Sequence, residues 1–200
     1  MRNKKDKNLD NFRNLSLQEK RLVSGIKLFN QEKRLRILKA LDLAKKSHKR
    51  QKRIEGDPFV IHPIRIVNII IYDLKITDAD MIISGLLHDV VEDTDTSIKK
   101  INQQFGKKIA RLVLALTRDK NKETKEEKFV KTLRSPKSVR ILKTCDWLDN
   151  LRSCALLTDH NEWWQRYTAQ GKEMSVPLAK STGNKWLIKE TEKALRTLLR

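Results

Sequence analysis

The sequence predicts an all-α protein, and three observations support this fold class. Glycine and proline are scarce, with six and four residues in a chain of 200, so little material is present for hairpins and sheets. The segment 31–52 is rich in Leu, Ala, Lys, Arg, Glu and Gln, which all favour helices. Hydrophobic residues make up 38% of the chain and charged residues 34%, a balance typical of helices with broad solvated faces.

A basic segment precedes the predicted domain. Residues 1–14 contain no apolar core segment, so we predict a disordered basic tail rather than a signal peptide. Residues 15–200 show no internal repeat and no low-complexity linker, and we predict that they form one domain. No apolar run comes near the roughly 18 residues of a membrane-spanning helix. Cys145 and Cys154 face different sides of one predicted helix, and two reduced thiols are typical of a cytoplasmic protein.

Two helices are predicted at the start of the domain. Residues 15–30 are expected to form a short helix with Ser16 as its N-cap and Glu19 in the capping-box position. Residues 31–53 are expected to form a longer helix, because apolar side chains recur along one face at helical spacing. These apolar side chains are Leu35, Leu38, Leu41 and Ala44.

Glycine and proline interrupt the helical pattern at 54–63. His62 is therefore predicted to lie at a junction between a loop and a helix, with Pro63 at the first helical position, where its missing N–H has no cost. The next helix is predicted at 64–74, and Thr77 predicts the start of another that continues to about residue 93. The remaining predicted elements are helices at 96–105 and 107–117 that meet at Gly106, a charged loop or exposed helix start at 118–128, a long helix at 136–157, and two or three helices after residue 161.

Four ionisable residues interrupt the most apolar segment of the chain. Residues 81–91 are almost wholly apolar until His88 and Asp89, so this helix is predicted to be buried. Side chains four residues apart share a helix face, which aligns His88 with Glu92 and Asp89 with Asp93. Burying these groups is costly, and a divalent cation such as Mn, Fe or Zn, bound by imidazole and carboxylate groups, would compensate them. An adjacent His-Asp pair nevertheless arises by chance in roughly one such chain in four, and a helix end with solvated acids is the alternative.

Further residues could complete such a site. His62 follows the break in the helical pattern, and Asp146 lies among apolar residues of a predicted helix, where it is equally compatible with a salt-bridged acid. Arg53 could grip a phosphate with its planar fork, or could simply stabilise a helix C-terminus. Lys120, in the charged segment, is predicted to contact an anionic substrate in the same way.

Three segments occur in a specific order along the chain. They are Ile61-His62-Pro63, Leu87-His88-Asp89-Val90-Val91-Glu92-Asp93-Thr94 and Cys145-Asp146-Trp147-Leu148-Asp149-Asn150-Leu151-Arg152. This ordered set resembles the HD hydrolase domain of the RelA/SpoT-type alarmone enzymes, and the likeness covers about residues 35–195. The resemblance implies a compact multi-helix HD-domain fold with a single buried metal site.

The resemblance also implies roles for particular residues. One Mn²⁺ ion would be bound by four side chains, which are His62, His88, Asp89 and Asp146. Glu92 and Asp93 would act on the attacking water, and Arg53 and Asn150 would contact the nucleotide. The implied partner is a small anionic nucleotide, and the implied reaction is hydrolysis of (p)ppGpp to GDP or GTP and pyrophosphate. The implied branch is that of the small stand-alone alarmone hydrolases.

Three positions depart from the usual pattern of that family. Ile54 and Trp147 stand where basic residues are usual, and Asp149 stands where His or Tyr is common. None of the three is an implied metal ligand, so the departures concern substrate choice, and (p)ppApp or NADPH is an alternative substrate. The net charge of +19 leaves a different class open, a nucleic-acid-binding protein with a degenerate hydrolase fold. No recognised nucleic-acid-reading motif supports that class.

Overall fold

The chain folds into helices joined by short loops. The computed structural model describes residues 10–157 and 162–199, and within them no β-strand occurs, only an isolated bridge between Lys52 and Pro58. The predicted all-α class is confirmed. The elements are α2 (Leu15–Gly25), η1 (Ile26–Leu28), α3 (Gln31–Ser47), α4 (Ile61–Asn68), η2 (Ile69–Asp73), α5 (Ala79–Leu87), α6 (Val90–Asp93), α7 (Ile98–Phe105), α8 (Lys107–Leu116), α9 (Lys125–Leu133), α10 (Lys137–Cys154), α11 (Glu162–Gln170), η3 (Gly171–Ser175), α12 (Val176–Thr182) and α13 (Lys185–Leu198).

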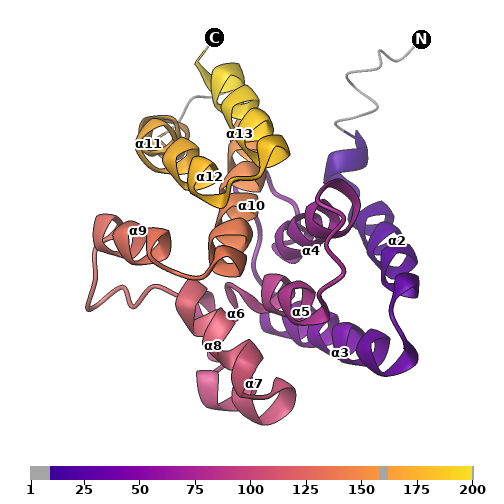
Figure 1. Cartoon of the computed structure of the whole chain (residues 1–200). Helices are drawn as coiled ribbons and strands as arrows, with labels where there is room; N and C mark the ends of the chain where they lie inside the picture. The colour runs from indigo at the N-terminus through magenta and orange to yellow at the C-terminus, as the bar shows by residue number, and fades with distance from the viewer. Residues whose placement is uncertain (1–9, 158–161, 200) are drawn as a thin grey trace, which may run out of the picture.

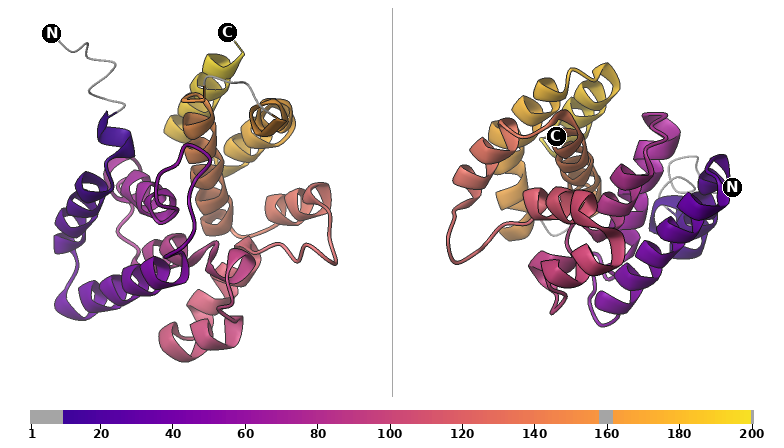
Figure 2. Two further views of the ribbon diagram at one scale, coloured as in Figure 1. Left: turned by 180° about the vertical axis from the view of Figure 1, so that it is seen from behind. Right: turned by 60° about the horizontal axis from the view of Figure 1, so that its bottom comes forward.

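Helix α10 lies at the centre of the molecule (Figure 1). Helices α12 and α13 pack along one side of it, and α4 packs along the other. Beyond α4 lie α2, α3 and α5, while α7 and α8 form a hairpin against α5. The two further views show that α10 passes between the N-terminal and C-terminal helices (Figure 2). Side chains of α10 therefore face helices from both halves of the chain.

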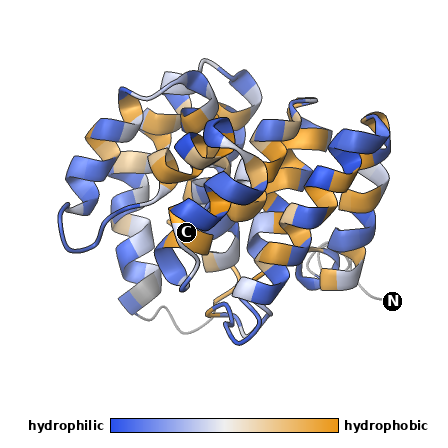
Figure 3. Ribbon diagram, turned by 90° about the horizontal axis from the view of Figure 1, so that it is seen from below, coloured by the Kyte–Doolittle hydropathy of each residue, from blue (hydrophilic) through white to orange (hydrophobic). Residues whose placement is uncertain are grey.

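Helices α4 and α5 form the interior of the N-terminal half. Every residue of α4 is buried, as is every residue of α5 except Asp80. A helix that is apolar all round is stable only when other elements cover all of its faces. Apolar residues accordingly gather on the inner faces of the packed helices (Figure 3). His62 on α4 and His88 at the end of α5 are thereby held inside the protein.

Several predicted boundaries are corrected by the structure. The helix predicted to run to residue 93 divides at His88 and Asp89, so α5 ends at Leu87 and α6 begins at Val90. Asp78 rather than Thr77 caps α5, because its carboxylate accepts from the backbone N–H of Asp80 and Met81. In the same way Asn14 rather than Ser16 caps α2. Helix α4 begins at Ile61, two residues before Pro63.

The predicted apolar face of α3 is also wrong in part. Leu35 and Leu38 are 59% and 39% exposed. The helix is turned so that a neighbouring face packs on α5, and it ends at Ser47, which leaves Arg53 in the following loop. The buried face consists of Ile37, Ala40, Leu41, Leu43 and Ala44.

A helical turn lies within the segment predicted as an N-terminal tail. Residues 1–9 of that segment lie outside the described residues, and 10–13 form the turn. The Arg13 guanidinium forms a bidentate ion pair with Asp57 and donates to the carbonyl of Glu55 at 2.7 Å. The turn is therefore attached to the loop that follows α3.

Other features agree with the sequence-based expectations. Gly106 has φ +90°, a conformation that favours glycine, and it separates α7 from α8. The charged segment contains the start of α9, where Thr124 and Glu127 form a capping box. Cys145 and Cys154 are buried, free thiols on α10. Among the described helices, none combines the length and apolar character needed to cross a bilayer.

Candidate active site

Two buried histidines meet between α4 and α5. Their ring centroids lie 5.2 Å apart, and the Nε2 atoms of both face the carboxylates of Asp89 and Asp146. The Nε2 atom of His62 is 3.1 Å from Asp146 Oδ1 and 3.7 Å from Asp89 Oδ2. The Nε2 atom of His88 is 3.0 Å from Asp89 Oδ2 and 3.9 Å from Asp146 Oδ1. The structure thus brings together all four side chains that the sequence predicts as metal ligands.

The donor set fits a divalent metal ion. His88 Nδ1 donates to the carbonyl of Gly85 at 2.8 Å, so Nε2 is the ring nitrogen directed into the cluster. That Nε2 atom is buried and has no well-aligned hydrogen-bond partner in the described part of the chain. Ligand atoms of His62, His88 and Asp89 lie within 4.8 Å of one another, a spacing that one ion could bridge. Asp146, on α10, adds a second carboxylate whose Oδ1 lies 3.1 Å from His62 Nε2.

Asp149 holds His62 from behind. The Nδ1–H of His62 donates to Asp149 Oδ2 at 2.6 Å, and Arg65 donates to the same carboxylate from Nε at 2.8 Å and from Nη2 at 2.9 Å. Asp149 is fully buried. This departure from the family pattern was predicted to concern substrate choice, but Asp149 contacts His62 and Arg65 and does not line the cleft. Its position three residues after Asp146, on the same side of α10, was the available signal.

Strong electrostatic coupling marks the cluster. Although burial lowers the pKa of His88, the neighbouring Asp89 and Asp146 carboxylates raise it to about 9. Burial raises the pKa of Asp89, but His88 outweighs it and lowers that pKa to about 2. Lys143 lies 2.7 Å from Asp146 Oδ2 and, against the burial of the carboxyl, helps to hold the Asp146 pKa well below its usual range. Carboxylates kept ionised in this way favour a bound cation.

The predicted catalytic acids lie beside the cluster on α6. Glu92 Oε2 accepts from the backbone N–H of Arg118 at 2.8 Å, and Glu92 and Asp93 line the same cleft as His62 and Asp89. Lys120 reaches back over this pair, 2.7 Å from Asp93 Oδ1 and 3.8 Å from Glu92 Oε1. Lys120, predicted to contact the substrate, thus contacts the two predicted catalytic acids.

Arg53 and Asn150, predicted to contact the nucleotide, contact each other. Arg53 Nη2 donates to Asn150 Oδ1 at 2.9 Å, and Asn150 Nδ2 donates to Asp146 Oδ1 at 2.7 Å. Both line a cleft of about 310 Å³ that is also lined by Phe59 and by three of the predicted metal ligands, His62, Asp89 and Asp146. A hydrogen-bonded chain therefore joins the predicted nucleotide contacts directly to a predicted metal ligand.

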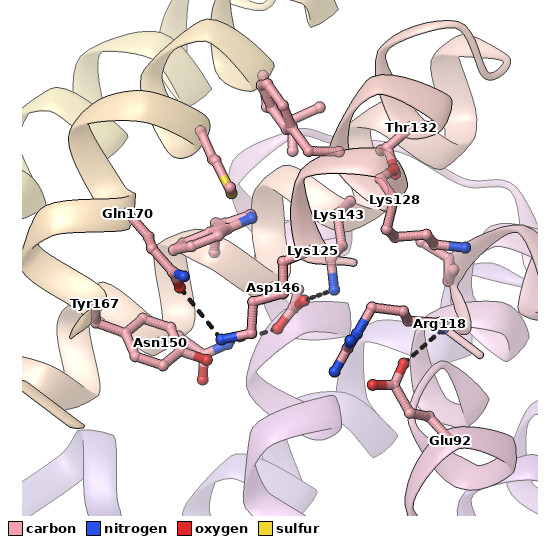
Figure 4. A pocket seen from close by; sticks show the side chains of 15 residues that line it. Glu92, Arg118, Lys125, Lys128, Thr132, Lys143, Asp146, Asn150, Tyr167 and Gln170 are labelled. Carbon is pink, nitrogen blue, oxygen red and sulfur yellow. Dashed lines mark hydrogen bonds and ion pairs between the residues drawn. The ribbon is translucent and has the colours of Figure 1, made fainter. Parts of the chain in front are cut away.

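A second pocket, of about 170 Å³, continues from this cleft between α9, α10 and α11 (Figure 4). Glu92, Lys143, Asp146, Asn150 and Tyr167 line both spaces. Trp147 lines the second pocket and lies against Tyr167, with ring centroids 5.5 Å apart. Unlike Asp149, this departure from the family pattern lines the second pocket. No pattern in the sequence predicted this pocket.

A family model described as HD domain matches residues 40–183. The chain belongs to the HD-domain family. Among curated proteins, it is 35% identical over 139 residues to human "guanosine-3′,5′-bis(diphosphate) 3′-pyrophosphohydrolase MESH1", which covers 67% of this chain and 76% of the relative. It is 33% identical over 164 residues to an Aquifex aeolicus guanosine-3′,5′-bis(diphosphate) 3′-pyrophosphohydrolase. That match covers 76% of this chain but only 22% of the Aquifex protein. The resemblance drawn from the sequence is confirmed.

Solved structures agree with this HD-domain assignment. One, described as "A metazoan ortholog of SpoT hydrolyzes ppGpp and plays a role in starvation responses", has a TM-score of 0.73 at 30% identity and covers 80% of this chain and 94% of its own. Another, of lmo0812 from Listeria monocytogenes, has a TM-score of 0.58 at 23% identity over 72% of this chain and 99% of its own. The second likeness concerns the fold alone.

Proposed function

We propose that this HD-domain protein is a metal-dependent (p)ppGpp 3′-pyrophosphohydrolase with Mn²⁺ as its ion. The observation that carries the proposal is the convergence of two histidine Nε2 atoms and two carboxylates beside a second acidic pair. The ligands would be His62, His88, Asp89 and Asp146. Imidazole and carboxylate together suit Mn²⁺, although Fe and Zn accept the same donors. The activity named for the human and Aquifex relatives supports the choice of substrate.

The chain's own residues account for the remaining chemistry. A divalent ion held by the four ligands would supply Lewis acidity toward the phosphoryl oxygens and would acidify water. Glu92 or Asp93 orients the attacking water and accepts its proton. The water oxygen bonds to the phosphorus attached to the 3′ oxygen, the bond between that phosphorus and the 3′ oxygen breaks, and the 3′ oxygen takes up a proton. The products are GDP or GTP and pyrophosphate.

Arg53, Asn150 and Lys120 are proposed to hold the nucleotide. Arg53 is suited to this role because its guanidinium lies in the cleft beside Phe59 and is fixed by Asn150 and by Glu55. Lys120 would move from Asp93 to a phosphate oxygen when substrate binds, which would also release the acid for catalysis. The two buried thiols on α10 suit a reducing compartment, and we place the protein in the cytoplasm.

A substrate panel with metal analysis tests this proposal. Purified protein would be loaded with Mn²⁺ and given ppGpp, ppApp and NADPH side by side, with pyrophosphate and phosphate measured. We expect pyrophosphate release from ppGpp to be the fastest reaction. The panel includes the other two because Ile54 and Trp147 differ from the family pattern and Trp147 lines the cleft's second pocket. Turnover of NADPH or ppApp without turnover of ppGpp would contradict the guanosine assignment and leave the metal site intact.

A further inference from the structure

The second pocket is strongly cationic beyond what the metal centre requires. Arg118, Lys125, Lys128 and Lys143 line it, and its acids are Glu92 and Asp146. Figure 4 shows the side chains of Arg118, Lys125 and Lys143 directed toward the same space beside Asp146. Most of the other residues that line the pocket are aromatic or apolar, among them Phe129, Met174 and Leu178. An apolar lining lowers the local dielectric and strengthens interactions between charges.

Three of these cations lack a carboxylate partner. Lys125 Nζ lies 3.4 Å from the amide oxygen of Gln170, and Lys128 donates to the carbonyl of Thr117. Arg118 Nη1 donates to the backbone carbonyl of Glu123 at 3.3 Å. Throughout 10–157 and 162–199, no carboxylate oxygen forms an ion pair within 4.0 Å with any of the three. The hydrogen-bond acceptors that they contact are neutral carbonyl and amide oxygens.

The acids of the pocket are already engaged. Asp146 pairs with Lys143 and His62, and Glu92 accepts from the backbone of Arg118. Burial lowers the pKa of Lys125, and repulsion by Arg166 and Arg118 lowers it further. A group of cations without carboxylate partners is stabilised by an anion that binds among them.

We propose that this pocket binds the pyrophosphate product of the reaction. In the substrate, it binds the outer phosphate of the 3′-diphosphate, the one distal to the scissile bond. This proposal rests on the proposed function. Arg53 and Phe59 line the cleft but not the pocket, and Asp146, a proposed metal ligand, lines both spaces. A nucleoside held on the Arg53 side directs its 3′-diphosphate across the metal and into the pocket. Both phosphate groups of that diphosphate leave in the product, so the cations of the pocket stay paired with an anion until pyrophosphate dissociates. The Arg118 fork and the Lys125 ammonium suit phosphate oxygens.

Calorimetric titration of Mn²⁺-loaded protein with inorganic pyrophosphate tests the site directly. The variants are Lys125→Ala and Arg118→Gln, the second of which keeps a hydrogen-bond donor near Glu123. The matched control is Lys131→Ala, because Lys131 lies on the same helix α9, is 68% exposed and pairs with Glu123. Each pocket variant is expected to raise the Kd for pyrophosphate about tenfold, as expected for a lost charge-assisted hydrogen bond, and the control to leave it unchanged. GDP, titrated in parallel, is expected to bind all four proteins equally.

The outcomes separate the two proposals. An unchanged pyrophosphate Kd in folded Lys125→Ala and Arg118→Gln, or an equal loss of GDP binding, overturns the pocket assignment. Turnover gives a second readout: the variants should lose activity on ppGpp and keep it on guanosine 5′-diphosphate 3′-monophosphate, which has no distal phosphate. Because the titration needs no turnover, wild-type protein that binds pyrophosphate through these residues but does not hydrolyse ppGpp would contradict only the proposed function.

Discussion

Replacement of Asp149 tests whether the buried support of His62 matters for metal binding. The Asp149 carboxylate accepts from His62 Nδ1 at 2.6 Å and from Arg65 Nε and Nη2 at 2.8 and 2.9 Å, with no solvent exposure. Asp149→Ala removes all three acceptor contacts and leaves the Arg65 guanidinium buried. Asp149→Asn keeps the shape and one carbonyl acceptor but removes the charge. The two variants therefore separate folding from positioning.

The size of each effect follows from the contacts that survive. Breaking a buried ion pair by removing one partner costs about 3–5 kcal/mol. Arg65 keeps the Ser153 hydroxyl at 3.0 Å and Glu55 Oε1 at 3.6 Å, so we expect the lower end, about 3 kcal/mol, for Asp149→Ala. For a chain of this size that corresponds to a melting temperature lower by roughly 6–12 °C. For Asp149→Asn we expect a smaller loss of stability but a 10–100-fold weaker affinity for Mn²⁺, because the His62 ring loses its charged orienting partner.

Thermal unfolding of the metal-free variants and calorimetric titration with Mn²⁺ measure the two quantities separately. Glu19→Gln serves as the control, since Glu19 on α2 forms a partly exposed pair with Lys45 on α3 and its loss should change neither quantity measurably. An Asp149→Asn protein that binds Mn²⁺ as tightly as wild type would refute the positioning role. An Asp149→Ala protein with unchanged melting temperature would refute the buried ion pair.

Three further predictions concern the pH dependence, the core and the N-terminal turn. Metal binding must displace the proton of His88, whose pKa is about 9 because Asp89 and Asp146 outweigh burial. The affinity for Mn²⁺ should therefore rise about tenfold per pH unit up to about pH 9 and level off above it. A Mn²⁺ affinity that does not change with pH in calorimetric titrations would contradict this. Gly85→Ala should destabilise the protein by about 1–3 kcal/mol in urea unfolding, because the new Cβ would lie 2.9 Å from Val67 Cγ1; unchanged stability would show that the helices separate easily. Arg13→Ala should raise KM for the nucleotide while kcat and stability change little, since its partly exposed contacts anchor the loop that carries Arg53; an unchanged KM would refute this.

The sequence predicted the parts of the site that depend on local pattern. The apolar run before His88 predicts a buried helix, and burial of an ionisable cluster requires compensation, so a metal site follows from local chemistry together with the family resemblance. The break in the helical pattern before His62 correctly predicts a loop-to-helix junction. In contrast, the division of the helix at His88 and Asp89 was not predicted, because an apolar run gives no signal of a single non-helical turn.

Features that depend on packing between distant segments were missed. Arg13 meets Asp57 across 44 residues, and Asp149 meets Arg65 across 84, and nothing in either local sequence identifies the partner. The face that α3 buries depends on how it rotates against α5, which the periodicity of its leucines does not determine. The cationic pocket requires α9, α10 and α11 to be placed together, so Lys125 looks like an ordinary surface lysine in the sequence.

Pyrophosphate release from ppGpp as a function of added Mn²⁺ tests the central claim most directly. Protein stripped of metal would be titrated with Mn²⁺, and the rate recorded for wild type and for His88→Ala. We predict that the wild-type rate rises from near zero and saturates at about one equivalent of ion per chain, as a single site requires, and that His88→Ala neither binds the ion tightly nor releases pyrophosphate. Equal pyrophosphate release by stripped wild-type protein, or by His88→Ala, would contradict the assignment of these residues to the catalytic metal.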